Sequence, residues 1–211
     1  MSEPGNLYVI SAPSGTGKTT LVKALVDCTP GITVSISHTT RDKRPGEMHG
    51  INYYFTNKEE FDHMVEHDDF LEHATVFGNC YGTSRKWVKD TLARGMDVIL
   101  EIDWQGAEQI HRLFANSTSI FILPPSVTDL YQRLIKRNQD HHEIIKQRIN
   151  DVRESTRHIH EYNYIVINDD FSAALNDLKM IVQVGRLAQA RQKVKFANLL
   201  EELVTAKVDG L

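Results

Sequence analysis

The stretch that decides the fold is YVISAPSGTGKTTLVKAL, residues 8–25, which joins an apolar run to a short glycine loop and an amphipathic segment. Residues 7–10 are apolar and β-prone, whereas apolar residues recur at helical spacing over residues 21–25. Between these segments, Gly15 and Gly17 permit backbone conformations that turn several N–H groups towards an anion, at the positive end of the helix dipole. A strand, a glycine loop and a helix in this order predict a phosphate-binding loop.

The loop follows the pattern G-x-x-x-x-G-K-[ST] except at its entry, where Ala12 stands in place of the first glycine. We expect Lys18 to reach the terminal phosphates of a nucleoside triphosphate and the Thr19 hydroxyl to ligate Mg²⁺ directly. The alternative is a glycine-containing turn with a solvated lysine, but the flanking strand and helix favour the phosphate loop. The predicted triphosphate-binding residues of the loop are Ala12, Pro13, Ser14, Gly15, Thr16, Gly17, Lys18, Thr19 and Thr20.

Composition limits the partners and the compartment. The 211 residues are 41% hydrophobic and 25% charged, and the formal charge of −4 argues against a nucleic-acid partner, since such proteins usually carry a basic excess. No apolar run approaches the roughly 20 residues that span a bilayer, and the N-terminus lacks the pattern of a secretion signal. Cys28 and Cys80 make neither a disulfide framework nor a zinc site. We therefore expect a cytoplasmic protein with no nucleic-acid and no membrane partner.

Strand-like and helix-like segments alternate along most of the chain. The apolar segments expected to form core strands, besides the first, are 32–37, 97–103, 119–124 and 164–168. The helical patterns between and after them are 105–114, 127–137 and the region from Phe171 towards the C-terminus. This alternation predicts an α/β fold, with a five-stranded parallel core sheet between two layers of helices.

Two segments interrupt the alternation and predict accessory parts. Residues 38–88 combine turn residues, aromatic alternation and a short helix at 58–67, which indicates a small mixed α+β insertion. The polar run RNQDHHE at 137–143 opens a predicted helical lid over 137–157. The core is then divided into residues 1–37, 89–136 and 158–211.

A pair of arginines follows the second predicted strand. Arg41 and Arg44 lie three residues apart at the sheet end where ligands meet open α/β sheets. The planar fork of arginine grips a phosphate with two hydrogen bonds. Two arginines in a loop are as readily explained as solvated surface residues until another feature joins them.

Six motifs taken together join these features. The stretches SAPSGTGKTTL, SISHTTRDKRPGEMHGINYYF, FLEHATVFGNCYGTS, LEIDWQGA, FILPPS and VINDD resemble the guanylate kinase family, specifically its bacterial members, in the family's order and spacing. The resemblance covers nearly the whole chain. It implies Mg²⁺-dependent transfer of the terminal phosphate of ATP to guanosine monophosphate (GMP), and to dGMP, giving ADP and GDP for purine nucleotide metabolism and GTP supply.

The resemblance assigns residues to the GMP site. The matched positions that hold the GMP phosphate are Ser37, Arg41, Arg44, Tyr53 and Tyr81. Glu72 and Thr83 match those that read guanine. Guanine offers two adjacent donors, N1–H and the 2-amino group, to a carboxylate, whereas adenine presents a bare acceptor that would leave a buried Glu72 unpaired. The alternative for Glu72 is a salt-bridged glutamate on a strand.

The remaining assignments lie at strand ends and in the lid. Family members usually carry aspartate at the position of Glu101, and the resemblance places Glu101 and Asp103 near GMP, with Asp103 also holding Mg²⁺ or its waters. Asn168 and Asp169 match the corner that meets the adenine of ATP. The predicted catalytic side chains are Lys18, Arg41, Arg44, Arg137 and Arg148. Arg133 fits a substrate contact and an exposed helix position equally well.

Three rival functions share parts of this pattern. The string DWQG at 103–106 fits a GTPase switch, but the only similar string to the N-K-x-D guanine motif lies far too early, at 57–60. Guanylate-kinase-like scaffold modules generally lose the phosphate loop and several arginines that this chain retains. A kinase for another monophosphate is disfavoured by Glu72 and Thr83. The oligomeric state, monomer or homo-oligomer, is left open, because the apolar C-terminal residues 199–204 suit packing on the core or on a partner equally.

Overall fold

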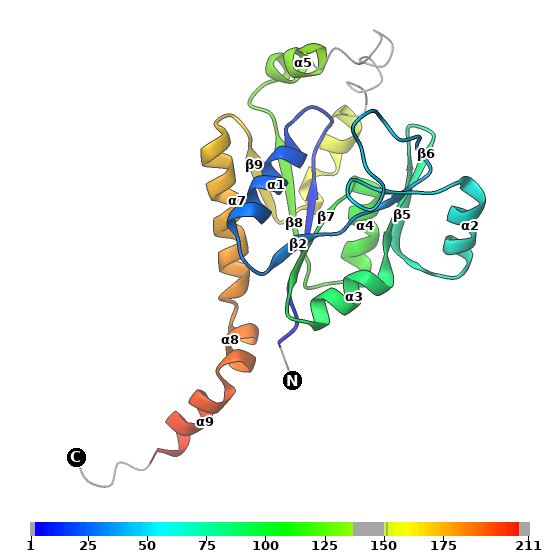
Figure 1. Ribbon diagram of the computed structural model, residues 1–211. Helices are drawn as coiled ribbons and strands as arrows, with labels where there is room; N and C mark the ends of the chain where they lie inside the picture. The colour runs from blue at the N-terminus through cyan, green and yellow to red at the C-terminus, as the bar shows by residue number, and fades with distance from the viewer. Residues whose placement is uncertain (1–2, 137–149, 151, 207–211) are drawn as a thin grey trace.

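A five-stranded sheet forms the centre of the computed structural model, which describes residues 3–136, 150 and 152–206 (Figure 1). Its strands are β1 (Leu7–Ser11), β2 (Ile32–Val34), β7 (Asp97–Glu101), β8 (Thr118–Leu123) and β9 (Tyr164–Ile167). Their order is β2-β7-β1-β8-β9, and every neighbouring pair is parallel. The predicted α/β fold with a five-stranded parallel sheet is confirmed. Because β1 lies in the middle, the loop that follows it leaves from the centre of the sheet.

Helices cover both faces of this sheet, and strand alternation decides which side chains each face buries. Tyr8 and Ile10 pack on the side of α1 and α7, whereas Leu7 and Val9 pack on the side of α3 and α4. All four side chains are at most 5% exposed. The helices are α1 (Lys18–Cys28), α3 (Arg85–Ala93), α4 (Trp104–Leu113) and α7 (Phe171–Arg186). Burial on both faces explains why these strands read as continuous apolar runs.

A second, smaller sheet makes the insertion. Its order is β4-β3-β6-β5, with β3 and β4 parallel and the other two pairs antiparallel. Its elements are β3 (His38–Thr39), β4 (Tyr54–Phe55), α2 (Lys58–Glu66), β5 (Phe70–Val76) and β6 (Asn79–Ser84). Phe61 of α2 packs on Phe70 and Cys80, which gives this sheet a small core of its own. The insertion is therefore a mixed β unit with one covering helix, as its sequence predicts.

Element bounds differ from expectation in two instructive places. The second strand ends at Val34 and not at residue 37, because after the Ser35 N–H to Ile99 O bond (2.9 Å) the chain leaves for the second sheet. Helix α3 is not among the predicted helices, although Ser84 is an N-cap whose side chain accepts from Trp87 N. This helix crosses residue 88, where the insertion was predicted to end.

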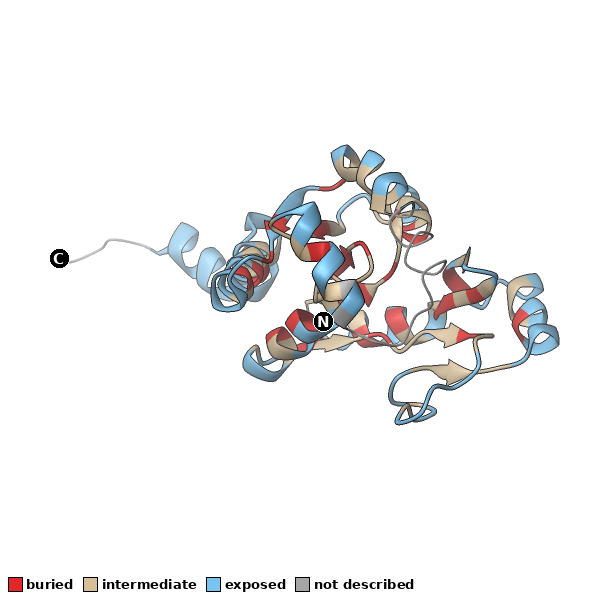
Figure 2. Ribbon diagram, turned by 90° about the horizontal axis from the view of Figure 1, so that it is seen from above, coloured by how far each residue is buried: buried red, intermediate tan, exposed pale blue. Residues whose placement is uncertain are grey.

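The C-terminal region, which is expected to be helical from Phe171 onwards, forms three helices in its described part. Helix α7 is followed by α8 (Gln189–Lys195) and α9 (Ala197–Thr205), which extend away from the body (Figures 1 and 2). Leu203 and Val204 are 67% and 86% exposed. Packing of this apolar stretch on the chain's own core, one of the two alternatives, is therefore wrong.

None of the helices in the described part of the chain combines the length and apolar character that a bilayer crossing requires.

Candidate active site

The loop between β1 and α1 has the backbone that its sequence predicts. Gly15 and Gly17 adopt φ angles of 90° and 91°, in the left-handed region that favours glycine. Gly17 is the N-cap of α1, so the helix begins at Lys18, with its free N–H groups at the loop. Thr16 closes the turn by donating from its backbone N and its Oγ1 to Pro13 O, at 3.4 and 3.0 Å. This arrangement suits an anion at the helix N-terminus.

The end of β9 holds the loop from the other side. Asn168 is 6% exposed and donates its Nδ2 to Thr16 O at 2.6 Å. A Cβ on Gly17 would lie 2.7 Å from the same nitrogen, so close approach as well as the positive φ requires glycine there. Asp169, the second residue of the predicted adenine corner, follows as an exposed side chain.

Arg133, which the sequence left open, bridges the same corner. It lies in α5 (Val127–Lys136) and donates to Thr16 O at 3.4 Å and to Asn168 O at 3.1 Å. It is half-buried there, so the reading as a free surface residue of a helix is wrong. Arg133 instead ties α5 to the phosphate loop and to the end of β9.

Two carboxylates from the end of β7 face the loop. Thr19 Oγ1 donates to Glu101 Oε2 at 3.0 Å. Desolvation by burial lowers the pKa of Lys18, while the charges of Glu101 and Asp103 oppose that change. The longer arm of glutamate at position 101 therefore still reaches the magnesium-ligating threonine of the predicted site.

Asp103 also has a local structural role that sequence reasoning missed. Its side chain is the N-cap of α4, accepting from Gly106 N at 3.0 Å, and its second oxygen accepts from Gln105 Nε2 at 3.1 Å. An aspartate directly before a helical pattern is the signal that could have revealed this cap.

The two arginines of the insertion differ in their surroundings. Arg41 is paired with Glu47 by two hydrogen bonds, of 2.7 and 3.0 Å, from one guanidinium nitrogen, and its guanidinium lies 5.4 Å from the centre of the Tyr53 ring. Burial alone would lower the Arg41 pKa, but the hydrogen bonds and charge of Glu47 raise it. Arg44 is exposed, and its backbone N donates to Glu47 Oε2 at 2.9 Å.

Glu47 was not among the predicted site residues. Burial opposes its ionisation, but Arg41 and the Arg44 backbone lower its pKa. Its place three residues after Arg44 in a turn is the only sequence signal for it. Glu47 thus engages guanidinium donors of Arg41 that could otherwise bind a phosphate.

The phenol rings of the predicted phosphate site share one face of the small sheet. Tyr53 and Tyr81 meet edge to face with ring centres 6.0 Å apart, and burial raises the pKa of Tyr53. Ser37 immediately precedes β3, and its carbonyl accepts from Tyr54 N at 2.9 Å. The structure thus brings Arg41, Tyr53 and Tyr81 together, with Ser37 at the adjoining strand end.

Glu72 and Thr83 form the most buried polar pair of this sheet. They are register partners on β5 and β6, and they are 3% and 0% exposed. Thr83 Oγ1 donates to Glu72 Oε1 at 2.5 Å. Desolvation raises the pKa of Glu72 to about 7, against the lowering effect of the Thr83 bond and with a further rise from the charge of Asp103. The reading of Glu72 as a salt-bridged strand residue is wrong, because the structure gives it a threonine partner and no ion pair among the described residues.

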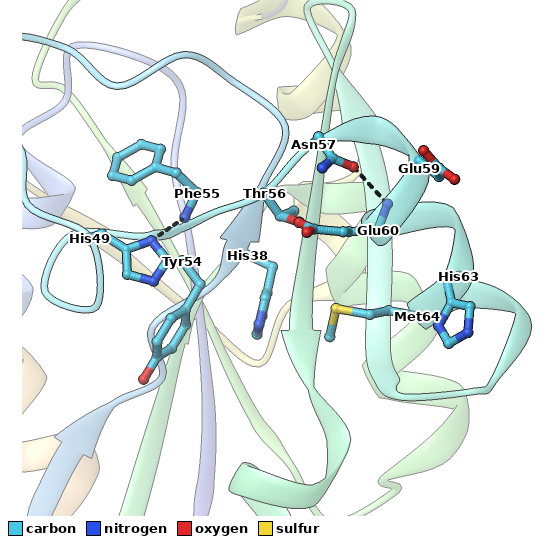
Figure 3. A pocket seen from close by; sticks show the side chains of 10 residues that line it. All are labelled: His38, His49, Tyr54, Phe55, Thr56, Asn57, Glu59, Glu60, His63 and Met64. Carbon is cyan, nitrogen blue, oxygen red and sulfur yellow. Dashed lines mark hydrogen bonds between the residues drawn. The ribbon is translucent and has the colours of Figure 1, made fainter.

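A cavity on the insertion lies away from these residues. It measures ≈730 Å³ and is lined by rings and carboxylates, among them His38, Tyr54 and Glu60 (Figure 3). His38 stacks on Tyr54 with ring centres 4.9 Å apart. None of the predicted site residues lines this cavity, since neighbouring strand residues such as Tyr53 and Tyr54 point to opposite faces.

Other predicted features complete the survey. Arg137 and Arg148, and nearly all of the predicted lid, lie outside the described residues. His63 and His67, four residues apart, stack on each other on α2 and its cap, and the described residues contain no cluster suited to a metal ion. Cys28 and Cys80 are free thiols, as expected.

The phosphate loop holds a lysine within electrostatic reach of two carboxylates, and the second sheet beside it contains a buried glutamate. This arrangement is that of a P-loop phosphotransferase. The family model for guanylate kinase matches residues 4–184. The guanylate kinase of Pseudomonas fluorescens (strain Pf0-1) is 57% identical over 200 residues, 95% of this chain and 97% of that protein. The guanylate kinase of Saccharophagus degradans is 52% identical over 97% of this chain and all of that protein.

A solved structure gives the same result. The crystal structure of guanylate kinase from Anaplasma phagocytophilum has a TM-score of 0.77 and 31% identity, and covers 98% of this chain and 99% of that one. The chain belongs to the guanylate kinase family. It is a kinase, an enzyme that phosphorylates GMP at the expense of ATP.

Proposed function

We propose that the residues described above divide the reaction between two sites, one for ATP on the β1–α1 loop and one for GMP on the small sheet. The observation that carries the proposal is the buried pair of Glu72 and Thr83, whose carboxylate lies close enough to Asp103 to be influenced by its charge. A triphosphate loop alone is common to many enzymes. A buried carboxylate within reach of guanine's two donors is what selects GMP as the acceptor.

In the proposed reaction, a phosphate oxygen of GMP attacks the γ-phosphorus of ATP. The new P–O bond forms as the bond from the γ-phosphorus to the β–γ bridging oxygen breaks, and the electron pair leaves with ADP. No general base is needed, because a phosphate monoester is largely ionised near pH 7. Lys18 and the loop N–H groups hold the ATP phosphates, and Arg41, Arg44, Tyr53, Tyr81 and Ser37 hold the GMP phosphate.

The residues near Thr19 fit a magnesium ion. Mg²⁺ prefers oxygen ligands, and Thr19 Oγ1 and the Glu101 carboxylate meet at 3.0 Å, with the charge of Asp103 close by. We propose Thr19 as a direct ligand, and the two carboxylates as holding the ion or its waters. When bound, the ion supplies positive charge to the β- and γ-phosphate oxygens.

The proposal also covers the contacts to adenine and to the transferring phosphate, the use of dGMP and the cellular compartment. Asn168 and Asp169 are proposed to border adenine, and Arg137 and Arg148 to neutralise charge as phosphate is transferred. Because the proposed contacts read the base and the phosphate, we propose that dGMP is also accepted. We place the enzyme in the cytoplasm, where its product GDP supplies the formation of GTP.

The test of the ATP site is the Lys18→Ala variant. We expect phosphoryl transfer to fall by roughly 10³-fold, because a charged donor aimed at the transferring group is lost. Lys23→Ala is the matched control, since Lys23 is an exposed residue of the same helix. ADP formation from ATP and GMP is measured for both variants, together with their melting temperatures. A folded Lys18→Ala variant with full activity would rule out the phosphate-loop assignment.

A further inference from the structure

A buried glycine in the first turn of α4 lies against the guanine-reading carboxylate. A Cβ placed on Gly106 would be 2.3 Å from Glu72 Oε2 and 3.1 Å from Glu72 Cδ. Cβ atoms essentially never approach another heavy atom as closely as 2.3 Å, so either the side chain of Glu72 or the helix would have to move. The space that a methyl group would fill is therefore already occupied by the carboxylate of Glu72.

Backbone conformation does not account for this glycine. Gly106 lies within α4 and is not among the residues with positive φ, so an alanine could adopt its backbone angles. Inside a helix, glycine is less favourable than alanine. The close approach of Glu72 is the contact that an alanine at this position would not permit. The Cβ would also lie 3.3 Å from Ile102 Cβ, which is a tight distance but not a clash.

The other side of the carboxylate is held as well. Thr83 Oγ1 donates to Glu72 Oε1 at 2.5 Å, from the strand next to β5. Glu72 is 3% exposed and α4 packs against β5, so its side chain has little room to rotate away. The carboxylate is thus fixed between a hydroxyl donor on one oxygen and the bare Cα of Gly106 at the other.

We propose that Gly106 is a positioning residue for guanine recognition, a role that rests on the proposed function of Glu72. By leaving out a side chain, Gly106 lets the carboxylate sit where its oxygens can accept from both N1–H and the 2-amino group of guanine. A methyl group at position 106 displaces the carboxylate, so one of the two hydrogen bonds or the Thr83 bond is lost.

The experiment is a double-mutant cycle between Gly106→Ala and Glu72→Asp. The KM for GMP, kcat, the Kd for ATP and the melting temperature are measured for the wild type, both single variants and the double variant. We expect Gly106→Ala to raise the KM for GMP about tenfold, with the Kd for ATP changed by less than about twofold. In the Glu72→Asp background the shorter arm withdraws from the methyl group, so Gly106→Ala should change the KM for GMP by less than about twofold.

Gly185→Ala is the matched control, because its Cβ would meet Tyr8 Oη at 2.6 Å, in α7 and outside the nucleotide site. We expect it to lower the melting temperature and to leave the KM for GMP near that of the wild type. A merely structural role for Gly106 would give the same pattern as this control. If Gly106→Ala fails to fold, recovery of folding in the double variant supports the proposal, and failure of both variants to fold overturns it.

Two results contradict the proposal itself. A folded Gly106→Ala variant with an unchanged KM for GMP would show that the carboxylate does not depend on the missing side chain. An equal loss in the Glu72 and Glu72→Asp backgrounds would show that Gly106 acts through another contact. Failure of the proposed function of Glu72 is separate, because Glu72→Asp alone would then leave the KM for GMP unchanged.

Discussion

The burial that suits the Glu72 carboxyl group to its proposed ligand also destabilises its ionised form in the protein without nucleotide. Burial raises its pKa to about 7, so near neutral pH the group without nucleotide is only partly ionised. The two guanine donors stabilise the ionised form, because they supply hydrogen bonds that the buried group otherwise lacks. The residue proposed to read the base is therefore also a residue that destabilises the folded chain without nucleotide.

The pH dependence of stability tests this account of Glu72. Its pKa is about 7 in the folded chain and 4.5 in the unfolded chain, so between these values the folded state keeps a proton that the unfolded state has lost. The contribution of Glu72 to the free energy of unfolding therefore falls as the pH rises from 4.5 to 7 and stays low above that. Glu72→Gln removes the titrating group, and the difference amounts to about 3 kcal/mol.

Urea unfolding without nucleotide at pH 5 and pH 8 measures this effect. We expect Glu72→Gln to be more stable than the wild type at pH 8, and to lose less stability between the two pH values. All other titrating groups are shared, so the comparison isolates position 72. Parallel pH profiles for the two proteins would show that the pKa of Glu72 is not raised.

For single residues, the loop pattern predicted which side chains belong to the triphosphate loop. The family resemblance singled out Glu72 and Thr83 as candidate guanine-binding residues. It did not predict the pairing of Arg41 with Glu47, because a side-chain contact across a turn has no fixed spacing. Nor did it separate the two readings of Arg133, since the carbonyls it contacts belong to segments more than thirty residues away in either direction. Such contacts follow from the fold and not from local pattern.

Between elements, a buried aspartate ties the start of β7 to the C-terminal helices. Asp97 is 1% exposed and accepts from Arg186 Nε at 2.7 Å, from Arg191 at 2.9 Å and from the backbone N of Asn6 at 2.7 Å. Arg191 also pairs with Glu3 at 2.6 Å. The network fixes the end of α7 and the start of α8 against the N-terminal end of the parallel strands, opposite the end that carries the nucleotide loop.

Removal of one member of this network should be costly. Asp97→Ala leaves two arginines without their buried partner, and we expect it to lower the free energy of unfolding by about 3–5 kcal/mol. Asp90→Ala is the control, because Asp90 pairs with Lys86 on an exposed helix face, and its loss costs less than about 0.5 kcal/mol. Denaturant unfolding measures the free energy of unfolding of both variants. Equal decreases for the two would refute the claim that the Asp97 network contributes more to stability than an exposed ion pair.

Most elements could be predicted because buried parallel strands and amphipathic helices leave clear periodic signals. Helix α3 was missed, although Ser84 caps it, because its short pattern follows directly on β6 with no loop between them. The break of the C-terminal stretch at residues 187–188 also escaped prediction. Helix ends there depend on contacts of Arg186 and Arg191 with the body, which periodicity does not record.

Across the whole molecule, the two sheets set the two proposed binding regions side by side. The phosphate loop leaves from the centre of the large sheet, and the small sheet lies beside it (Figure 1). Glu72 and Tyr81 belong to strands of the small sheet, and the two arginines lie in the loop between β3 and β4. Contacts of α4 with β5 join them, so the Asp103 cap of α4 lies close enough to both Lys18 and Glu72 to influence the pKa of each. The proposed order of events, with one phosphate passing from the first region to the second, follows from this layout.

The central claim is that phosphate passes from ATP to GMP because Glu72 reads guanine. ADP formation from ATP and Mg²⁺ is measured with GMP, AMP, CMP or UMP as acceptor, for the wild type and for Glu72→Gln. We predict that the wild type uses GMP at least about 10²-fold better than the other acceptors, and that Glu72→Gln loses most of this preference. Equal use of AMP by the wild type, or a preference for GMP that Glu72→Gln leaves intact, would contradict the account.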